Sequence, residues 1–168
     1  MIDSNFIKNS KLDTLNVSRE TLNDLNEYSS SIITKNKKIN LISKDSEKHI
    51  NSRHIIDSAQ TIDFINKNDI NTCTDLGSGA GLPGIVLAIL MKHKKPLFKV
   101  ILYEKSFHKS NFLKEMSQKF KLNTEIHQKN IFEERNLKSD VIISRAFKSL
   151  PILLEIASTN FKNFKYII

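Results

Sequence analysis

The sequence predicts an α/β fold in which a parallel β-sheet carries helices on both faces and follows a helical extension. From residue 72 onward, short apolar runs typical of buried strands alternate with segments of helical periodicity. All four glycines of the 168-residue chain fall between positions 77 and 84, where a strand pattern meets a helix pattern. Alternation of this kind gives right-handed crossovers and a parallel sheet.

The helical extension is expected to cover residues 1–66, and the sheet domain residues 67–168. Residues 1–16 show no clear periodicity. A first helix is predicted from an N-cap at Ser18 to about Lys37, because apolar residues recur at helical spacing between them. By the same criterion, a second helix is predicted from about Ser46 to Ile65.

Within the sheet domain, the apolar runs and helical periods define the order of the elements. Strands are predicted at residues 72–76, 98–104, 124–128, 139–144 and 164–168, and helices at residues 82–92, 107–120 and 149–159. The last strand is apolar and would form an exposed sheet edge, which natural proteins avoid. We therefore expect the chain to lack the final elements of its sheet.

The composition indicates a polyanionic partner such as a nucleic acid, since the formal net charge is +8. The single cysteine, Cys73, lies in the first predicted strand, excludes an intrachain disulfide and is expected in the core. No window approaches the ~20 apolar residues that span a bilayer, and the histidines lack the spacing of metal ligands. We expect a cytoplasmic, monomeric protein that binds neither membrane nor metal.

The glycine window has two interpretations, both of which predict backbone N–H groups facing a nucleotide-like ligand. In the first, Gly79, Gly81 and Gly84 match the spacing of the dinucleotide-binding fingerprint. Glu104 then lies at the distance expected for an acid that binds a ribose. This interpretation predicts an NAD-dependent oxidoreductase.

In the second interpretation, Gly77, Gly79 and Gly81 follow Asp75 in the pattern of S-adenosylmethionine-dependent methyltransferases, and Glu104 again holds the ribose hydroxyls. Asp75 at the strand tip favours this interpretation, because its carboxylate would repel a pyrophosphate but attract a sulfonium or an ammonium group. The enzyme would then methylate either an RNA or a small molecule. A chain that only binds RNA remains a non-catalytic alternative.

Four sequence pieces resemble the GidB (RsmG) family of small-subunit ribosomal RNA guanine methyltransferases. They are residues 40–43 (Asn-Leu-Ile-Ser), 53–58 (Arg-His-Ile-Ile-Asp-Ser), 75–84, and 144–147 (Ser-Arg-Ala-Phe). The resemblance implies a class I S-adenosylmethionine-dependent methyltransferase fold with a Rossmann-like parallel sheet of order 3-2-1-4-5. It further implies methyl transfer to ring nitrogen 7 of a guanine in 16S ribosomal RNA, with the small ribosomal subunit as partner.

The resemblance also implies a set of cofactor contacts. The family's contacts correspond to Gly77, Leu82, Ile131, Phe132 and Arg145, and Glu104 matches the acidic position after the second strand. Asn130 departs from the family's usual residue but could hydrogen-bond an adenine edge, with Ile131 or Phe132 covering the ring. Arg145 is the expected catalytic residue.

The implied chemistry requires no catalytic acid–base pair. Guanine N7 carries an in-plane lone pair and no proton at neutral pH, so the site needs only to position the reactants and to place charge. For RNA contacts we expect basic residues around the cofactor site, which would neutralise phosphates without reading sequence. The expected RNA-binding residues are Lys37, Lys38, Arg53, His54 and Lys105.

Overall fold

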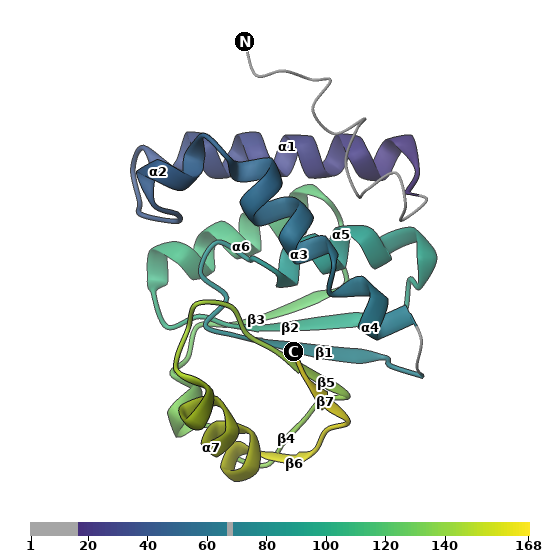
Figure 1. Cartoon of the computed structure of the whole chain (residues 1–168), viewed down its shortest axis with the longest axis vertical. Coiled ribbons are helices and arrows are strands. Elements are labelled where there is room, and N and C mark those ends of the chain that lie inside the picture. Colours follow the sequence, from purple (N-terminus) through teal and green to yellow (C-terminus); the bar gives the residue numbers. More distant parts are fainter. Residues whose placement is uncertain (1–16, 67–68) are drawn as a thin grey trace.

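The computed structural model describes residues 17–66 and 69–168 as stacked layers (Figure 1). At the top of the view, helix α1 (Arg19–Asn36) lies over a layer formed by α5 (Gly84–Lys94) and α6 (Phe107–Lys119). The central sheet follows, and α7 (Leu150–Asn160) covers its other face. The prediction of helices on both faces is therefore confirmed.

The central sheet is entirely parallel and has the strand order β3-β2-β1-β5-β7. Its strands are β1 (Thr72–Leu76), β2 (Lys99–Tyr103), β3 (Thr124–His127), β5 (Val141–Ile143) and β7 (Tyr166–Ile167). Counted along this sheet alone, the order is 3-2-1-4-5, as expected. Each observed strand lies within its predicted range, and β7 occupies the edge.

Two short strands escaped prediction, namely β4 (Leu137–Lys138) and β6 (Phe161–Asn163), which pair with each other in a separate two-stranded sheet. A 3₁₀ turn, η4 (Ile131–Glu133), follows β3. Each of these two strands contains a single apolar residue, Leu137 in β4 and Phe161 in β6, so neither segment shows the apolar run that predicted the strands of the central sheet.

The helical extension begins as predicted and then departs from the prediction. Ser18 caps α1, since its Oγ accepts a hydrogen bond from the Thr21 N–H at 3.1 Å. The single helix predicted from about Ser46 to Ile65 is wrong. In its place are α2 (Lys44–Glu47), the π-helical turn η3 (Asn51–Ile56), α3 (Asp57–Ala59) and α4 (Ile62–Asn66).

The capping of α2 explains why the predicted start was late. Ser43 is the N-cap and accepts a hydrogen bond from the Ser46 N–H through Oγ, so the helix begins before Ser46. The Asn36 side chain accepts hydrogen bonds from the Leu41 and Ile42 N–H groups at 2.7 and 3.1 Å, which fixes the loop before it. Helix periodicity alone cannot distinguish a π-helical turn from an α-helical one.

Two apolar clusters hold the layers together. The larger one joins α1 and the α5–α6 layer to one face of the sheet, and Cys73 is fully buried within it, as expected for a core thiol. The smaller one joins α7 to the opposite face through residues such as Ile142 and Ile156. Within residues 17–66 and 69–168, the structure contains no helix with the length and apolar composition of a membrane span.

Candidate active site

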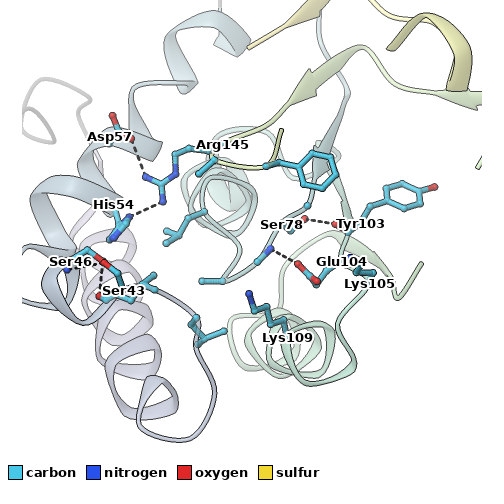
Figure 2. Close-up of a pocket in the computed structure, with 18 of the residues that line it drawn as sticks. Ser43, Ser46, His54, Asp57, Ser78, Tyr103, Glu104, Lys105, Lys109 and Arg145 are labelled. Atoms are coloured by element: carbon cyan, nitrogen blue, oxygen red, sulfur yellow. Dashed lines mark hydrogen bonds and ion pairs between the residues drawn. The ribbon is translucent and has the colours of Figure 1, made fainter. Parts of the chain in front are cut away.

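A cavity of about 800 Å³ opens at the carboxyl edge of the sheet, where the loops after β1, β2, β3 and β5 converge on the helical extension. The predicted site residues that line it are Gly77, Gly79, Leu82, Glu104, Asn130, Ile131, Arg145, Arg53, His54 and Lys105. Figure 2 shows these loops meeting around the cavity, with His54 and Arg145 on one side and Glu104 on another. The structure thus brings together most of the residues singled out in the sequence.

The glycine loop and Glu104 form one hydrogen-bonded unit. The Glu104 carboxylate accepts hydrogen bonds from the Gly79 N–H at 2.9 Å and from the Ser106 N–H at 2.8 Å. The Ser78 N–H donates to the Tyr103 carbonyl at 3.0 Å, which ties the loop to the end of β2. Glu104 is 8% exposed and lines the cavity. Because the Gly79 and Ser106 N–H groups hold its carboxylate, the carboxylate has a fixed orientation toward any occupant.

Gly77 is required by its conformation and by its neighbour. Its φ of 67° lies in the left-handed region that favours glycine. A Cβ at this position would overlap the Phe147 ring, which lies against the loop. Gly79 also has a positive φ, 56°, but a Cβ there would come no nearer than 3.8 Å to another atom. Phe147 therefore approaches the glycine loop at one point, where only glycine fits.

Asp75 lies outside the cavity, contrary to the idea that its carboxylate faces the cofactor. The side chain is 1% exposed, and its Oδ2 accepts a hydrogen bond from the Gly84 N–H at 3.0 Å. Burial raises its pKa to about 7, an effect that the Gly84 hydrogen bond partly opposes. The carboxylate therefore holds the first turn of α5, and Glu104 is the buried carboxylate that lines the cavity.

Gly81 and Phe132 likewise do not line the cavity. A Cβ on Gly81 would overlap Ile85 and Leu113, so this glycine permits close packing of α5 and α6. Phe132 is 41% exposed, whereas its neighbour Ile131 is 3% exposed and lines the cavity. Of the two apolar residues expected to cover an adenine ring, the structure orients Ile131 toward the site.

The Arg145 side chain, which follows β5, hydrogen-bonds residues of the helical extension and so joins it to the sheet domain (Figure 2). One of its terminal nitrogens, Nη1, donates to Asp57 Oδ2 at 3.1 Å and to the Arg53 carbonyl at 3.2 Å. The other, Nη2, lies 2.8 Å from His54 Nδ1. Because a guanidinium is only a donor, Nδ1 must accept, which makes His54 neutral with its proton on Nε2.

The pKa of His54 agrees with this arrangement. Burial is the main cause that lowers it below its ordinary value, and the positive charge of Arg145 lowers it further. The Nε2 atom is buried and lacks a hydrogen-bond partner among the described residues. His54 thus acts as an acceptor for Arg145 rather than as a cation, which differs from the phosphate-neutralising role expected from the sequence.

The other expected RNA-binding residues divide into two groups. Arg53 and Lys105 line the cavity, whereas Lys37 and Lys38 are exposed just beyond the end of α1 and do not line it. Two further lysines, Lys109 and Lys129, line the cavity. The basic flank predicted from the sequence therefore includes the wall of the cavity itself.

Some residues around the site were not assigned a role from the sequence. Tyr28 of α1 fits the apolar face of that helix, but its buried hydroxyl donates to the Ala80 carbonyl in the glycine loop. The loop before α2 also contributes Leu41 and Ser43 to the cavity. In the described ranges, 17–66 and 69–168, no group of three or more metal-ligating side chains lies close together.

The site fits an adenosyl ligand by the chemistry of its donors. Glu104 offers carboxylate oxygens to ribose hydroxyls, while Leu82 and Ile131 offer apolar surface to an aromatic base. Asn130 lies beside them, with its Nδ2 donating to Glu133 Oε1 at 2.8 Å and its Oδ1 accepting from the Phe132 N–H at 3.4 Å. The Gly79 N–H already donates to the Glu104 carboxylate, so this donor of the glycine loop is not free to bind a pyrophosphate.

Solved structures share the fold. A putative O-methyltransferase from Klebsiella pneumoniae superimposes with a TM-score of 0.59 at 11% identity, over 92% of this chain and 64% of that one. A putative protein-L-isoaspartate O-methyltransferase from Plasmodium falciparum, in complex with S-adenosyl-L-homocysteine, gives 0.55 at 20% identity, over 91% and 78%. These similarities confirm the class I methyltransferase fold.

Sequence relatives are more informative. Ribosomal RNA small subunit methyltransferase G of Pelagibacter ubique is 50% identical over 155 residues, which cover 91% of this chain and 72% of that protein. The protein of the same name from Cereibacter sphaeroides is 38% identical, over 87% and 70%. The family model for rRNA small subunit methyltransferase G (GidB) matches residues 21–168. The chain therefore belongs to this family of S-adenosylmethionine-dependent rRNA methyltransferases.

Proposed function

We propose that this chain transfers the methyl group of S-adenosylmethionine to ring nitrogen 7 of a guanine in 16S ribosomal RNA. The observation that carries the proposal is one cavity in which the glycine loop and Glu104 share walls with Arg53, Arg145 and Lys105. The glycine loop and Glu104 suit a nucleoside cofactor, and the three basic side chains suit a polyanionic substrate. The family and the names of its members support an rRNA as that substrate.

Within this cavity, each wall would have a distinct part in binding the cofactor. Glu104 would accept hydrogen bonds from the ribose hydroxyls, because the Gly79 and Ser106 N–H groups already orient its carboxylate. Leu82 and Ile131 would cover the adenine, and Asn130 would bond its edge. When bound, the cofactor supplies an electrophilic methyl group on a sulfonium sulfur.

The reaction would proceed without a general base. The N7 lone pair forms the new N–C bond while the S–C bond breaks, and no proton has to leave the guanine. The cavity residues agree with this, because His54 Nδ1 accepts from Arg145 and both Glu104 oxygens accept backbone N–H groups. What the residues contribute is orientation of the base and exclusion of water.

Arg145 is the residue best suited to orient the target base. Within the described part of the chain, three of the five guanidinium N–H groups donate to Asp57, the Arg53 carbonyl and His54. The remaining N–H groups could donate to O6 of the guanine. The methylated ring gains a positive charge, which an unpaired arginine would repel. Its ion pair with Asp57 reduces that repulsion.

The substrate would be the small ribosomal subunit or its RNA, and the reaction would therefore occur in the cytoplasm. The basic residues would neutralise phosphates around the target, so affinity for RNA should fall steeply with salt. The proposal includes Lys37 and Lys38 as more distant phosphate contacts, since both are exposed.

The test is transfer of a radiolabelled methyl group to small subunits isolated from a strain that lacks the enzyme. Label should enter 16S rRNA, and chain cleavage specific for N7-methylguanine should map it to one nucleotide. Glu104→Gln, which weakens the ribose contact, should raise the KM for the cofactor. Label on another atom or RNA would refute the assignment, and label only in small molecules would favour a small-molecule methyltransferase.

A further inference from the structure

Two phenylalanine rings lie side by side at the edge of the cavity. Phe147 lines the cavity and packs against Gly77, and Phe132 lies next to it, with ring centroids 6.2 Å apart and planes tilted by 39°. Phe132 is 41% exposed and does not line the cavity. The rings therefore form a step from the cavity wall to the outer surface.

A cation lies over both rings. Lys148 Nζ is 5.8 Å from the Phe132 centroid and 6.0 Å from the Phe147 centroid. Lys148 itself is exposed, so its charge remains available to solvent or to a phosphate. We name Phe132, Phe147 and Lys148 the aromatic step.

The backbone beneath Phe132 is held in place. The Asn130 side chain caps the turn by accepting from the Phe132 N–H at 3.4 Å, and Arg135 Nη1 donates to the Phe132 carbonyl at 2.7 Å. Of the two nearby carboxylates, Glu134 pairs with Lys129 at 3.0 Å, and Glu133 accepts from Asn130. The exposed ring thus lies on a fixed turn whose carboxylates are both engaged, Glu134 by a lysine and Glu133 by a neutral amide.

Packing explains the position of Phe147 but not that of Phe132. Phe147 is accounted for by its packing on Gly77. An exposed phenylalanine alone carries no implication, because single apolar residues are common on surfaces. Phe132 stands out through its combination of exposure, a shared cation and a neighbouring ring, Phe147, that lines the cavity.

We propose that the aromatic step binds an unpaired nucleobase of the RNA substrate, adjacent to the methylated guanine, by stacking it on Phe132 while Lys148 contacts a flanking phosphate. Aromatic side chains next to cations are the usual means by which proteins bind single-stranded nucleic acids. The proposal rests on the RNA methyltransferase function, and it names a substrate contact outside the cofactor site. It also predicts that the RNA near the target is single-stranded.

The test uses the full chain saturated with S-adenosylhomocysteine and compares binding of a twelve-nucleotide single-stranded oligouridine with that of a fully paired RNA duplex. Phe132→Ala should weaken single-strand binding roughly tenfold and duplex binding less than twofold. Phe132→Trp should restore it, since any flat aromatic ring can stack. Lys148→Gln should weaken the binding of both RNAs, because a phosphate contact does not depend on base stacking.

Phe164→Ala is the matched control. Phe164 is 38% exposed and precedes β7, next to Lys165, whose N–H bonds the Asp140 carbonyl at the start of β5. It therefore lies near the amino ends of the strands, opposite the cavity, and its truncation should leave RNA binding unchanged.

Two results would overturn the aromatic step. One is unchanged single-strand affinity in Phe132→Ala. The other is a loss of cofactor affinity in that variant, which would make Phe132 an adenine contact. If the wild-type chain methylates small subunits and either result is found, the aromatic step fails while the proposed function stands. If the wild-type chain methylates no RNA, the proposed function fails instead, and the binding data still decide the aromatic step.

Discussion

The Tyr28 hydroxyl donates a hydrogen bond to the Ala80 carbonyl oxygen, which joins the first long helix to the glycine loop. Tyr28 is fully buried, and its ring meets Phe120 edge-on at a centroid distance of 6.4 Å. Burial, together with the nearby Asp75, raises the pKa of the phenol well above its ordinary value, so the hydroxyl remains a donor. The helical extension therefore supports the cofactor loop directly.

Removing this hydrogen bond should disturb both the loop and the fold. Tyr28→Phe keeps the ring but leaves the buried Ala80 carbonyl without its donor, which costs about 1–3 kcal/mol of unfolding free energy. Affinity for the cofactor should fall as well, because the loop is less rigidly held. Urea unfolding and calorimetry with S-adenosylhomocysteine measure the two effects. Ser30→Ala removes an exposed hydroxyl of the same helix and should change neither quantity measurably.

The two cavity-lining glycines should respond differently to alanine. Gly79→Ala should cost about 1–2 kcal/mol of stability, because its φ is positive but the space around its Cβ is open. Gly77→Ala should cost more, since the added methyl group also overlaps Phe147. In the double variant Gly77→Ala/Phe147→Ala, that additional cost should be largely absent. A double-mutant cycle from denaturant unfolding would contradict this reasoning if the two changes were additive.

Asp75 should make the stability of the fold depend on pH. The folded protein binds the Asp75 proton more tightly than the unfolded chain does, since the pKa is about 7 against an ordinary 3.8. This stabilisation is fully present below the unfolded pKa and is lost as the pH rises through about 7. Asp75→Asn stays neutral and retains an acceptor for the Gly84 N–H.

The stability of Asp75→Asn relative to the wild type should therefore rise between pH 4 and pH 8. The expected gain is roughly 4 kcal/mol, because one pKa unit corresponds to about 1.4 kcal/mol. Urea unfolding of both proteins across this range gives the difference directly. If the free energies of unfolding of the two proteins changed with pH in parallel, the Asp75 carboxyl would have the same pKa in the folded and the unfolded protein, which would contradict this prediction.

The sequence was sufficient for those parts of the site that depend on strand order. Glu104 directly follows β2, and Gly77 directly follows β1, so neighbouring parallel strands bring them to the same edge. The pattern of apolar runs was enough to place both. Asp75 shows the limit of this reasoning, because its position near a strand tip does not determine which face of the sheet its side chain takes.

Contacts between distant parts of the chain could not be predicted. Tyr28 and Ala80 are 52 residues apart, and His54 and Arg145 are 91 apart. Each pair depends on how the helical extension docks on the sheet domain and on the π-helical turn that carries His54. Local periodicity contains neither piece of information, so it could not show that these residues contact each other.

The His54–Arg145 contact should weaken in acid. Because the pKa of His54 is lowered in the folded protein, its stabilisation is present above the ordinary pKa and is lost as the pH falls below that value. A protonated Nδ1 cannot accept from Arg145 and would add a positive charge beside Arg53. The wild type should therefore lose more stability between pH 8 and pH 5.5 than His54→Asn, which keeps an acceptor near the Nδ1 position and does not titrate.

Thermal unfolding at the two pH values measures this difference. His49→Asn removes an exposed histidine one to two turns earlier in the chain and should follow the wild type. An equal acid loss in the His54→Asn variant would show that other groups carry the pH dependence.

The basic residues around the cavity should contribute to RNA affinity through charge alone. Charge reversal at Lys37 and Lys38 should weaken RNA binding for all sequences and leave cofactor affinity unchanged, since neither residue lines the cavity. Each lost phosphate contact should reduce the slope of log K against log salt by about 0.7–0.9. Arg53→Glu should do the same and in addition disturb the site, because the Arg53 carbonyl accepts from Arg145. Filter binding of small-subunit rRNA at several salt concentrations gives the slopes.

The control is Lys121→Glu. Lys121 is exposed and precedes β3, so it lies at the amino ends of the strands, away from the cavity, and the variant should bind RNA as the wild type does. If RNA affinity were unchanged by reversal at Lys37, Lys38 and Arg53, these residues would be an ordinary solvated surface.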